Sequence, residues 1–353
     1  MTKTLKYVVI SLGVLALAAA ASQAVFLLGH PYFCKYARQN GVSLRVARDT
    51  WGRPNADSEW LMGLSVEGFE EHWDKVLELT ETDRTSEIGT YYHNLASAMT
   101  GSLPDGLLDY YQPFERGLFL PVDDKATPFR ITCSGDVWFH LGEMTMAEHS
   151  AILGMIFSPE HSGPRHLERM AEINLVTGQT ASAAKYLGIL SCGSPSERRW
   201  AREHGEETMG VEVRGRIMNL RSLQPSFDLV HGASQTPLTL RILLSSNPDN
   251  RMALDYLLCY DLLTKDLEAF MGDYAPSLTS SHLYDEAVLM FLYVHGALTQ
   301  ENVDHFRIGP EVGERFTEYM SIIERDGGSG RNVPRELKNS YWYFYHFATR
   351  NEN

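Results

Sequence analysis

The stretch "LERMAEINLVTGQTASAAKYLGIL", residues 167–190, predicts two short amphipathic helices joined at Thr177-Gly178. Its apolar residues recur at spacings of three and four, which places them on one face of each helix. Gly178 can adopt the left-handed conformation that ends a helix. We therefore interpret the stretch as a helical hairpin, with packing positions at Leu167, Met170, Ala171, Ala183 and Leu187.

The spacing within this hairpin resembles the tetratricopeptide repeat. That signature places W-x2-L-G-x2-Y on a first helix, Ala-x3-Phe on a second, and Pro at the end of a unit of about 34 residues. Stacked helix pairs of this kind bury a core that no single pair could. We predict a degenerate tetratricopeptide-like α-solenoid. The signature positions are held here by Leu167, Met170, Ala171, Asn174, Ala183, Leu187 and Pro195, and a literal W-x2-L-G opening occurs at 138–142.

Most of the remaining chain also has helical periodicity. An apolar stripe predicts one helix from about residue 58 to residue 80 with an acidic exposed face, and further helices fit 237–271, 281–296, 310–325 and 334–349. Residues 112–134 predict a long loop, and "VEVRGRI" at 211–217 predicts a short strand or a loop. Since strands at regular spacing are absent from the pattern, the predicted fold class is all-α.

The N-terminal segment predicts a membrane anchor. Residues 7–29 carry no charge, and this length is enough to cross a hydrocarbon core of about 30 Å. A signal peptide is the alternative, because Lys3 and Lys6 precede the apolar run and Ser22-Gln23-Ala24 resembles a cleavage site. The apolar run continues beyond that site, which favours a retained anchor. We expect a single-pass protein of a bacterial inner membrane.

The sequence does not decide on which side of the membrane the C-terminal part lies. A positive-inside count places the C-terminal part in the cytoplasm, whereas a signal-anchor interpretation places it outside. The predicted organisation along the chain is an anchor or uncleaved signal at 1–29, a basic juxtamembrane segment at 30–56, tetratricopeptide-like repeats at 57–203, an irregular connection at 204–236 and a C-terminal helical region at 237–353.

Composition excludes some classes of partner. The formal net charge is −14, and basic residues do not cluster with aromatic residues, so we expect no binding of nucleic acid. The four cysteines lack the spacing of a zinc site. They are interpreted as buried small residues or as members of one or two disulfides: Cys34, Cys133, Cys192 and Cys259.

Several longer segments resemble an uncharacterised family of Bacteroidota membrane proteins. They include "YYHNLASAMTGSLPDGLLDYYQ", "GDVWFHLGEMTMAEHSAILGM" and "NPDNRMALDYLLCYDLLTKDLEAF", and the resemblance covers most of residues 66–271. It implies a membrane region followed by a soluble tetratricopeptide-like part, without an activity or a catalytic residue. This chain differs in having one membrane segment rather than many.

Candidate chemical groups occur in two places. His140, Glu143, Glu148 and His149 are the densest set of possible metal ligands, but at 100° per residue the four do not converge on a helix, so we interpret them as ordinary polar-face residues. His161, Arg165, His166 and Glu168 surround a helix start that begins with Pro, where charge near the helix end is a sufficient explanation.

The C-terminal "YWYFYHFA" at 341–348 could offer aromatic platforms to a sugar or a peptide. Packing onto the preceding helix is the favoured interpretation, because the aromatic residues form one helical stripe. That stripe contains Tyr341, Phe344, Tyr345 and Ala348.

The sequence predicts no catalytic, cofactor-binding or metal-binding residue and no cofactor, since it lacks the hydrolase, zinc-protease and P-loop motifs. The leading hypothesis is a membrane-anchored helical-repeat scaffold that binds a protein or peptide partner on its concave surface. The alternative is a cell-envelope enzyme or glycan-binding protein with a cleft between the repeats and the C-terminal helices.

Overall fold

A computed structural model describes residues 14, 20–82, 84–226 and 235–350. The prediction of an all-α fold is confirmed, because the described residues form α-helices and short 3₁₀ turns without a strand. The first helices are α2 (Pro31–Gln39), α3 (Leu44–Thr50), α4 (Ala56–Phe69), α5 (Trp73–Thr80), α6 (Glu87–Met99) and α7 (Leu103–Gly106), followed by the turns η1 (Leu107–Asp109) and η2 (Phe114–Gly117).

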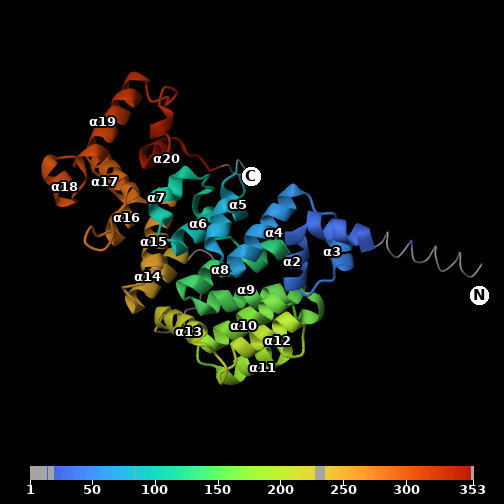
Figure 1. Cartoon of the computed structure of the whole chain (residues 1–353). Helices are drawn as coiled ribbons and strands as arrows, with labels where there is room; N and C mark the ends of the chain where they lie inside the picture. Colours follow the sequence, from blue (N-terminus) through green and yellow to red (C-terminus); the bar gives the residue numbers. More distant parts are fainter. Residues whose placement is uncertain (1–13, 15–19, 83, 227–234, 351–353) are drawn as a thin grey trace, which may run out of the picture.

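The central helices lie together at the lower side of Figure 1. They are α8 (Pro128–Leu141), α9 (Met144–Phe157), α10 (Pro164–Val176), α11 (Thr180–Leu190), α12 (Pro195–Glu203) and α13 (Val211–Leu223), with η3 (Pro159–His161) before α10. The last group extends away from them: α14 (Thr236–Ser246), α15 (Arg251–Thr264), α16 (Leu267–Asp273), α17 (His282–Val294), α18 (Gln300–His305), α19 (Pro310–Arg325), η4 (Arg335–Leu337) and α20 (Tyr341–Phe347).

The hairpin predicted at 167–190 is present as α10 and α11, which pack closely on each other. The turn lies where Thr177-Gly178 predicted it, and Gly178 has a φ of +77°. Four of the five predicted packing residues are buried and Leu187 is half-buried. The helix pair is thus confirmed.

The single helix expected from about 58 to 80 is two helices. α4 ends at Phe69 and α5 begins at Trp73. Between them, Glu71 adopts a left-handed backbone with a φ of 62°, and His72 donates its amide to the Glu67 carbonyl at 2.9 Å. The break places Glu71 beside Arg216 of the later helix that contains residues 211–223.

The strand or loop predicted at 211–217 is also wrong, because these residues begin the helix α13. Its valines cost little in a helix, whereas burial of Ile217 and Leu220 in the main core stabilises it. Arg221 strengthens the contact by donating to the carbonyls of Leu175 and Val176 at the end of α10. Residues 227–234 of the predicted irregular connection lie outside the described part.

One large core joins α4–α11 to α13–α17, α19 and α20, and a smaller core lies under α2 and α3. The small core is attached to α4 by Glu59, whose carboxylate accepts the amides of Tyr32 and Phe33 in the first turn of α2. A carboxylate at this position satisfies amides that have no partner within the helix. This contact fixes α2 beside the end of α4.

The predicted anchor lies largely outside the described residues. Residues 20–29 are helical, and in that helix Val25 and Leu28 are 71% and 83% exposed. Among the described residues, no helix has the length and apolar character needed to cross a bilayer. The cysteines carry no disulfide; Cys34, Cys133 and Cys259 are buried, as expected of small apolar residues, and Cys192 is exposed.

Candidate functional site

A charged cleft of about 540 Å³ opens between α2, the break after α4, and helices α10, α12 and α13. Its wall contains five glutamates, three long cationic side chains and one tryptophan. The charged and aromatic residues that line it include Lys35, Arg38, Glu70, Glu71, His72, Glu168, Glu172, Glu197, Trp200, His204 and Arg216. We refer to this site as the charged cleft.

The floor of the charged cleft is a buried ion network. Asp136 of α8 accepts from Arg165 Nη2 at 2.8 Å and from Arg169 Nη2 at 3.2 Å, and Arg169 Nη1 lies 3.3 Å from Glu172 Oε2. All four side chains are at least nine-tenths buried. Buried charges are tolerated only when paired and hydrogen-bonded. The network therefore fixes α10 against α8 beneath the cleft.

Arg216 of α13 extends this network to the cleft wall. It pairs with the carboxylates of both Glu172 and Glu71. Burial by itself would raise the pKa of Glu172, but Arg216 and Arg169 outweigh it and lower that pKa. Glu172 is consequently a carboxylate in the folded protein. The backbone of Glu71 is left-handed, a conformation that favours glycine, and its carboxylate pairs with Arg216.

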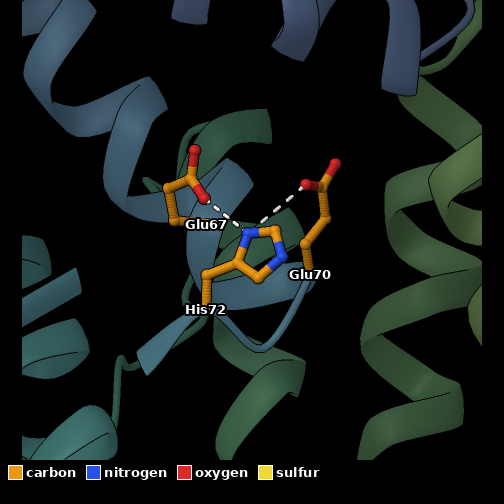
Figure 2. A group of neighbouring side chains, drawn as sticks. All are labelled: Glu67, Glu70 and His72. Atoms are coloured by element: carbon orange, nitrogen blue, oxygen red, sulfur yellow. Dashed lines mark hydrogen bonds and ion pairs between the residues drawn. The ribbon is translucent and has the colours of Figure 1, made fainter. Parts of the chain in front are cut away.

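A second group of side chains surrounds the break (Figure 2). His72 Nδ1 lies 2.7 Å from Glu67 Oε2 and 3.7 Å from Glu70 Oε2. One ligand atom from each of Glu67, Glu70 and His72 lies within 4.8 Å of the others, so the three residue types and their spacing could hold a divalent cation. Lys35 Nζ, however, lies 2.6 Å from Glu70 Oε2 and 4.0 Å from Glu67 Oε1. The chain itself therefore supplies the cation that neutralises this group.

Glu168 differs from the other glutamates of the cleft. It takes part in no ion pair between described residues, and the carboxylates of Glu172, Glu197 and Glu70 surround it. Burial and these neighbouring charges raise the pKa of Glu168 to about 8. At neutral pH its carboxyl group is therefore mainly protonated. Such a group can donate a hydrogen bond, or it can ionise when a cation arrives.

The aromatic part of the wall comes from α12. Trp200 stacks on His204 with ring centroids 3.7 Å apart, and His204 Nδ1 is 2.9 Å from the Trp200 carbonyl. The stack holds the half-buried indole at the rim beside Glu197. An indole face binds cations or the apolar faces of sugars.

A second hollow of about 480 Å³ adjoins the first. The two share Glu71 and His72, and the second continues over α5 past Asp74, Lys75 and Glu78. The depressions thus follow one another across the break between α4 and α5.

The chain was compared with known protein families, curated proteins and solved structures. The sequence model of a family of unknown function, DUF6057, matches residues 1–348. The chain belongs to this family. No curated protein and no solved structure matches it. The match confirms an uncharacterised family, while the Bacteroidota source and the tetratricopeptide-like region stay predictions.

The possible metal ligands of α8 and α9 do not form a site in this DUF6057 protein. Glu143 is buried and caps α9 by accepting the Met146 amide at 2.9 Å, whereas Glu148 is half-buried and His149 is exposed. His140 is buried, its Nε2 lacks a hydrogen bond, and that atom is 4.0 Å from Glu71 Oε1. Burial, together with Arg169 and Arg216, lowers the pKa of His140 to about 3. It is a neutral residue beneath the cleft.

The residues at the start of α10 have larger roles than charge near a helix end. Arg165 lies in the buried network and Glu168 in the charged cleft, while His166 is buried and His161 is exposed. The sequence analysis did not predict these positions of Arg165 and Glu168. Arg165 and Arg169 are four residues apart, as are Glu168 and Glu172, and this double charged pattern in a helix with a predicted buried face was the available signal.

The C-terminal aromatic residues pack inward. Tyr341 and Trp342 are fully buried, Tyr341 donates to the Leu262 carbonyl at 3.3 Å, and Phe344 and Tyr345 rest on the main core. Lys265 donates to the carbonyls of Tyr345 and Ala348 and so holds the end of α20. These contacts match the packing interpretation rather than an aromatic platform.

Proposed function

We propose that this DUF6057 protein is a membrane-anchored helical scaffold that holds a basic segment of a protein partner in its charged cleft. The observation that carries the proposal is the unpaired carboxyl group of Glu168 among three other carboxylates in a cleft of about 540 Å³. A lysine or arginine side chain of a partner would supply the cation that this group lacks.

The charges of the cleft support a cationic ligand. Three of its glutamates already have a cationic partner in the chain: Glu70 pairs with Lys35, and both Glu71 and Glu172 pair with Arg216. Glu168 and Glu197 have no such partner among the described residues. Glu197 instead accepts from Ser194 Oγ at 2.5 Å. These two carboxyl groups and the Trp200 face form the part of the cleft that remains available to a ligand cation.

The form of the surface supports a peptide. The adjoining hollow over α5 carries Asp74, and Glu78 that pairs with Lys75 at 2.8 Å, so one acidic group without a cationic partner among the described residues lies beyond the first cleft. An extended segment could place one basic side chain beside Glu168 and another over α5. The uncharged residues 7–29 and the stacked helix pairs are the basis for the anchor and the repeat scaffold in this proposal.

Isothermal titration of the full chain in detergent micelles tests the proposal. The ligands are oligoarginine, oligolysine and oligoglutamate peptides of equal length. We expect the two basic peptides to bind and the acidic one not to bind. The double variant E168Q/E197Q should weaken basic-peptide binding by roughly tenfold or more, since two partly buried charge contacts are lost.

A matched control separates the cleft from net charge. Glu318 and Glu324 are exposed on α19, far from the charged cleft, so E318Q/E324Q makes the same change in charge elsewhere. It should leave the affinity unchanged. Equal weakening by both double variants, or absence of basic-peptide binding, would contradict the proposal.

The second candidate function is a cell-envelope enzyme or glycan-binding protein. One observation favours it: a protonated carboxyl group at Glu168 shares a cleft with carboxylates and with Trp200. A raised pKa suits a general acid, and an indole suits a sugar face. The cleft lies between α2, the end of α4, α10, α12 and α13 rather than beside the C-terminal helices. Release of reducing sugar from peptidoglycan fragments, lost in E168Q, would support this function over peptide binding.

A further inference from the structure

The exposed side of α3 forms a small basic and aromatic face. Arg45, Val46 and Arg48 are exposed on this helix, and Trp51 and Arg53 follow directly after it. Val46 is 46% exposed and Trp51 is 40% exposed, while Ala47 on the opposite side is buried in the small core. We call these five residues the α3 face.

The α3 face is joined to the helix that leaves the apolar N-terminal segment. Arg48 lies over the Phe26 ring at 4.7 Å from its centroid. Phe26 packs edge-on against Phe33, and Phe33 packs in the same way against Trp51. These contacts hold residues 20–29 beside α3, as the N-terminal end of Figure 1 shows. The end of the uncharged segment is therefore fixed next to the α3 face.

The charge of this face is opposite to that of the protein. Residues 44–53 include the three exposed arginines and one exposed acidic residue, Asp49, whereas the whole chain has a net charge of −14. A general solvated surface of this protein would be acidic. The arginines are therefore concentrated next to the segment that is predicted to enter the membrane.

We propose that the α3 face lies on a layer of anionic lipid headgroups. Guanidinium groups bind phosphate oxygens in a bidentate manner, and a basic cluster beside a membrane segment is attracted to anionic lipids. Trp51 has the amphipathic side chain that is enriched at the level of the headgroups, and Val46 adds apolar area beside it. The occupant is a lipid surface because the neighbouring residues 7–29 are uncharged and apolar.

This inference rests on membrane insertion of residues 7–29 and is independent of peptide binding in the charged cleft. Its test is hydrogen exchange of the full chain in two kinds of nanodisc, one of phosphatidylcholine alone and one that also contains phosphatidylglycerol. We expect the amides of 44–53 to exchange more slowly in the anionic disc, and high salt to remove the difference by screening.

The variant R45Q/R48Q/R53Q should abolish this difference. Loss of three arginines from an anionic surface lowers the preference of the face for that surface by roughly a hundredfold. R325Q/R331Q/R335Q is the matched control, because these exposed arginines lie at the opposite end of the molecule. It should retain the protection.

Three outcomes would overturn the inference. They are equal exchange of 44–53 in both discs, an equal effect of the two triple variants, and failure of the full chain to enter either disc. Protection of 44–53 that appears only after a protein partner is added would assign the face to that partner instead. Failure of basic peptides to bind the cleft leaves this result unaffected.

Discussion

Arg165 Nη2 lies 2.8 Å from Asp136 Oδ2, and the side chains of both residues are at most 4% exposed. Arg165 also donates to the backbone carbonyl and the hydroxyl of Ser65 in α4. A single guanidinium group thereby joins α4, α8 and α10. The walls of the charged cleft depend on this junction, because the break after α4 and the helix α10 supply four of its five glutamates.

Asp136→Asn should destabilise the protein strongly. It leaves Arg165 buried without a counter-charge and Arg169 with Glu172 as its remaining partner, and removal of one member of a buried ion pair costs about 3–5 kcal/mol. Urea unfolding followed by circular dichroism measures the loss. Tyr92→Phe keeps the charge of Asp136 and removes the hydroxyl that bonds to Asp136 Oδ2 at 2.8 Å and to Ser65 Oγ at 3.3 Å, so it should cost about 1–2 kcal/mol. Equal losses in the two variants would contradict the dominant role of charge.

The left-handed Glu71 permits a separation of backbone and side-chain effects. Glu71→Gly and Glu71→Ala both remove the pair with Arg216, but only alanine retains the cost of a left-handed backbone. The alanine variant should therefore be less stable than the glycine variant by about 1–2 kcal/mol. Thermal unfolding of both variants measures the difference. Equal stability would show that the break relaxes to another conformation.

The helix pair α10–α11 was predictable because its signals are local. Thr177-Gly178 marks the turn, and the apolar residues at spacings of three and four mark the buried faces. The break after Phe69 had no comparable signal. Glu70, Glu71 and His72 contain neither glycine nor proline, and the apolar spacing continues from Phe69 to Trp73 across them. The side-chain partner of Glu71 in the break is Arg216, 145 residues away.

The charged cleft could not be predicted because its residues are also far apart in the sequence. Its members come from α2, α4, α10, α12 and α13, so periodicity within one helix does not bring them together. Sequence spacing treated His140 and Glu143 as members of one helix, but α8 ends at Leu141 and Glu143 caps α9. The spacing also could not show that His140 is buried beneath arginines. Interpretation of Arg165 as a charge near a helix end failed because its partner, Asp136, lies on a different helix.

Two helical glycines offer a matched test of packing. A Cβ atom at Gly154 in α9 would lie 2.3 Å from His166 Cε1, whereas one at Gly188 in α11 would meet no atom within 4 Å. Gly188→Ala should stabilise the protein by about 0.5–1 kcal/mol because alanine favours the helix. Gly154→Ala should instead destabilise it by about 1–3 kcal/mol, since the imidazole must move in a packed region. Urea titration of each variant and of the parent gives the change in the free energy of unfolding, and the two changes should have opposite signs. An increase in stability in both variants would show that His166 moves freely.

Glu168 should make stability depend on pH. Its pKa is about 8 in the folded protein against an ordinary value of 4.5 in the unfolded chain. Below pH 4.5 both states hold the proton, so the group has no effect. Between pH 4.5 and 8 the unfolded chain releases the proton while the folded protein keeps it, and stability falls as the pH rises. Above pH 8 both states are ionised and the full penalty is present.

Glu168→Gln removes this ionisation and is the direct test. The variant should match the parent below pH 4.5 and become progressively more stable than the parent up to pH 8. Other carboxyl groups with a raised pKa, such as Asp261 and Glu286, are present in both proteins, so their effects cancel in the difference. Urea unfolding across this pH range measures the difference. A constant difference at all pH values would mean that Glu168 ionises in the folded protein as it does in water, and a basic ligand would then bind without release of a proton from this site.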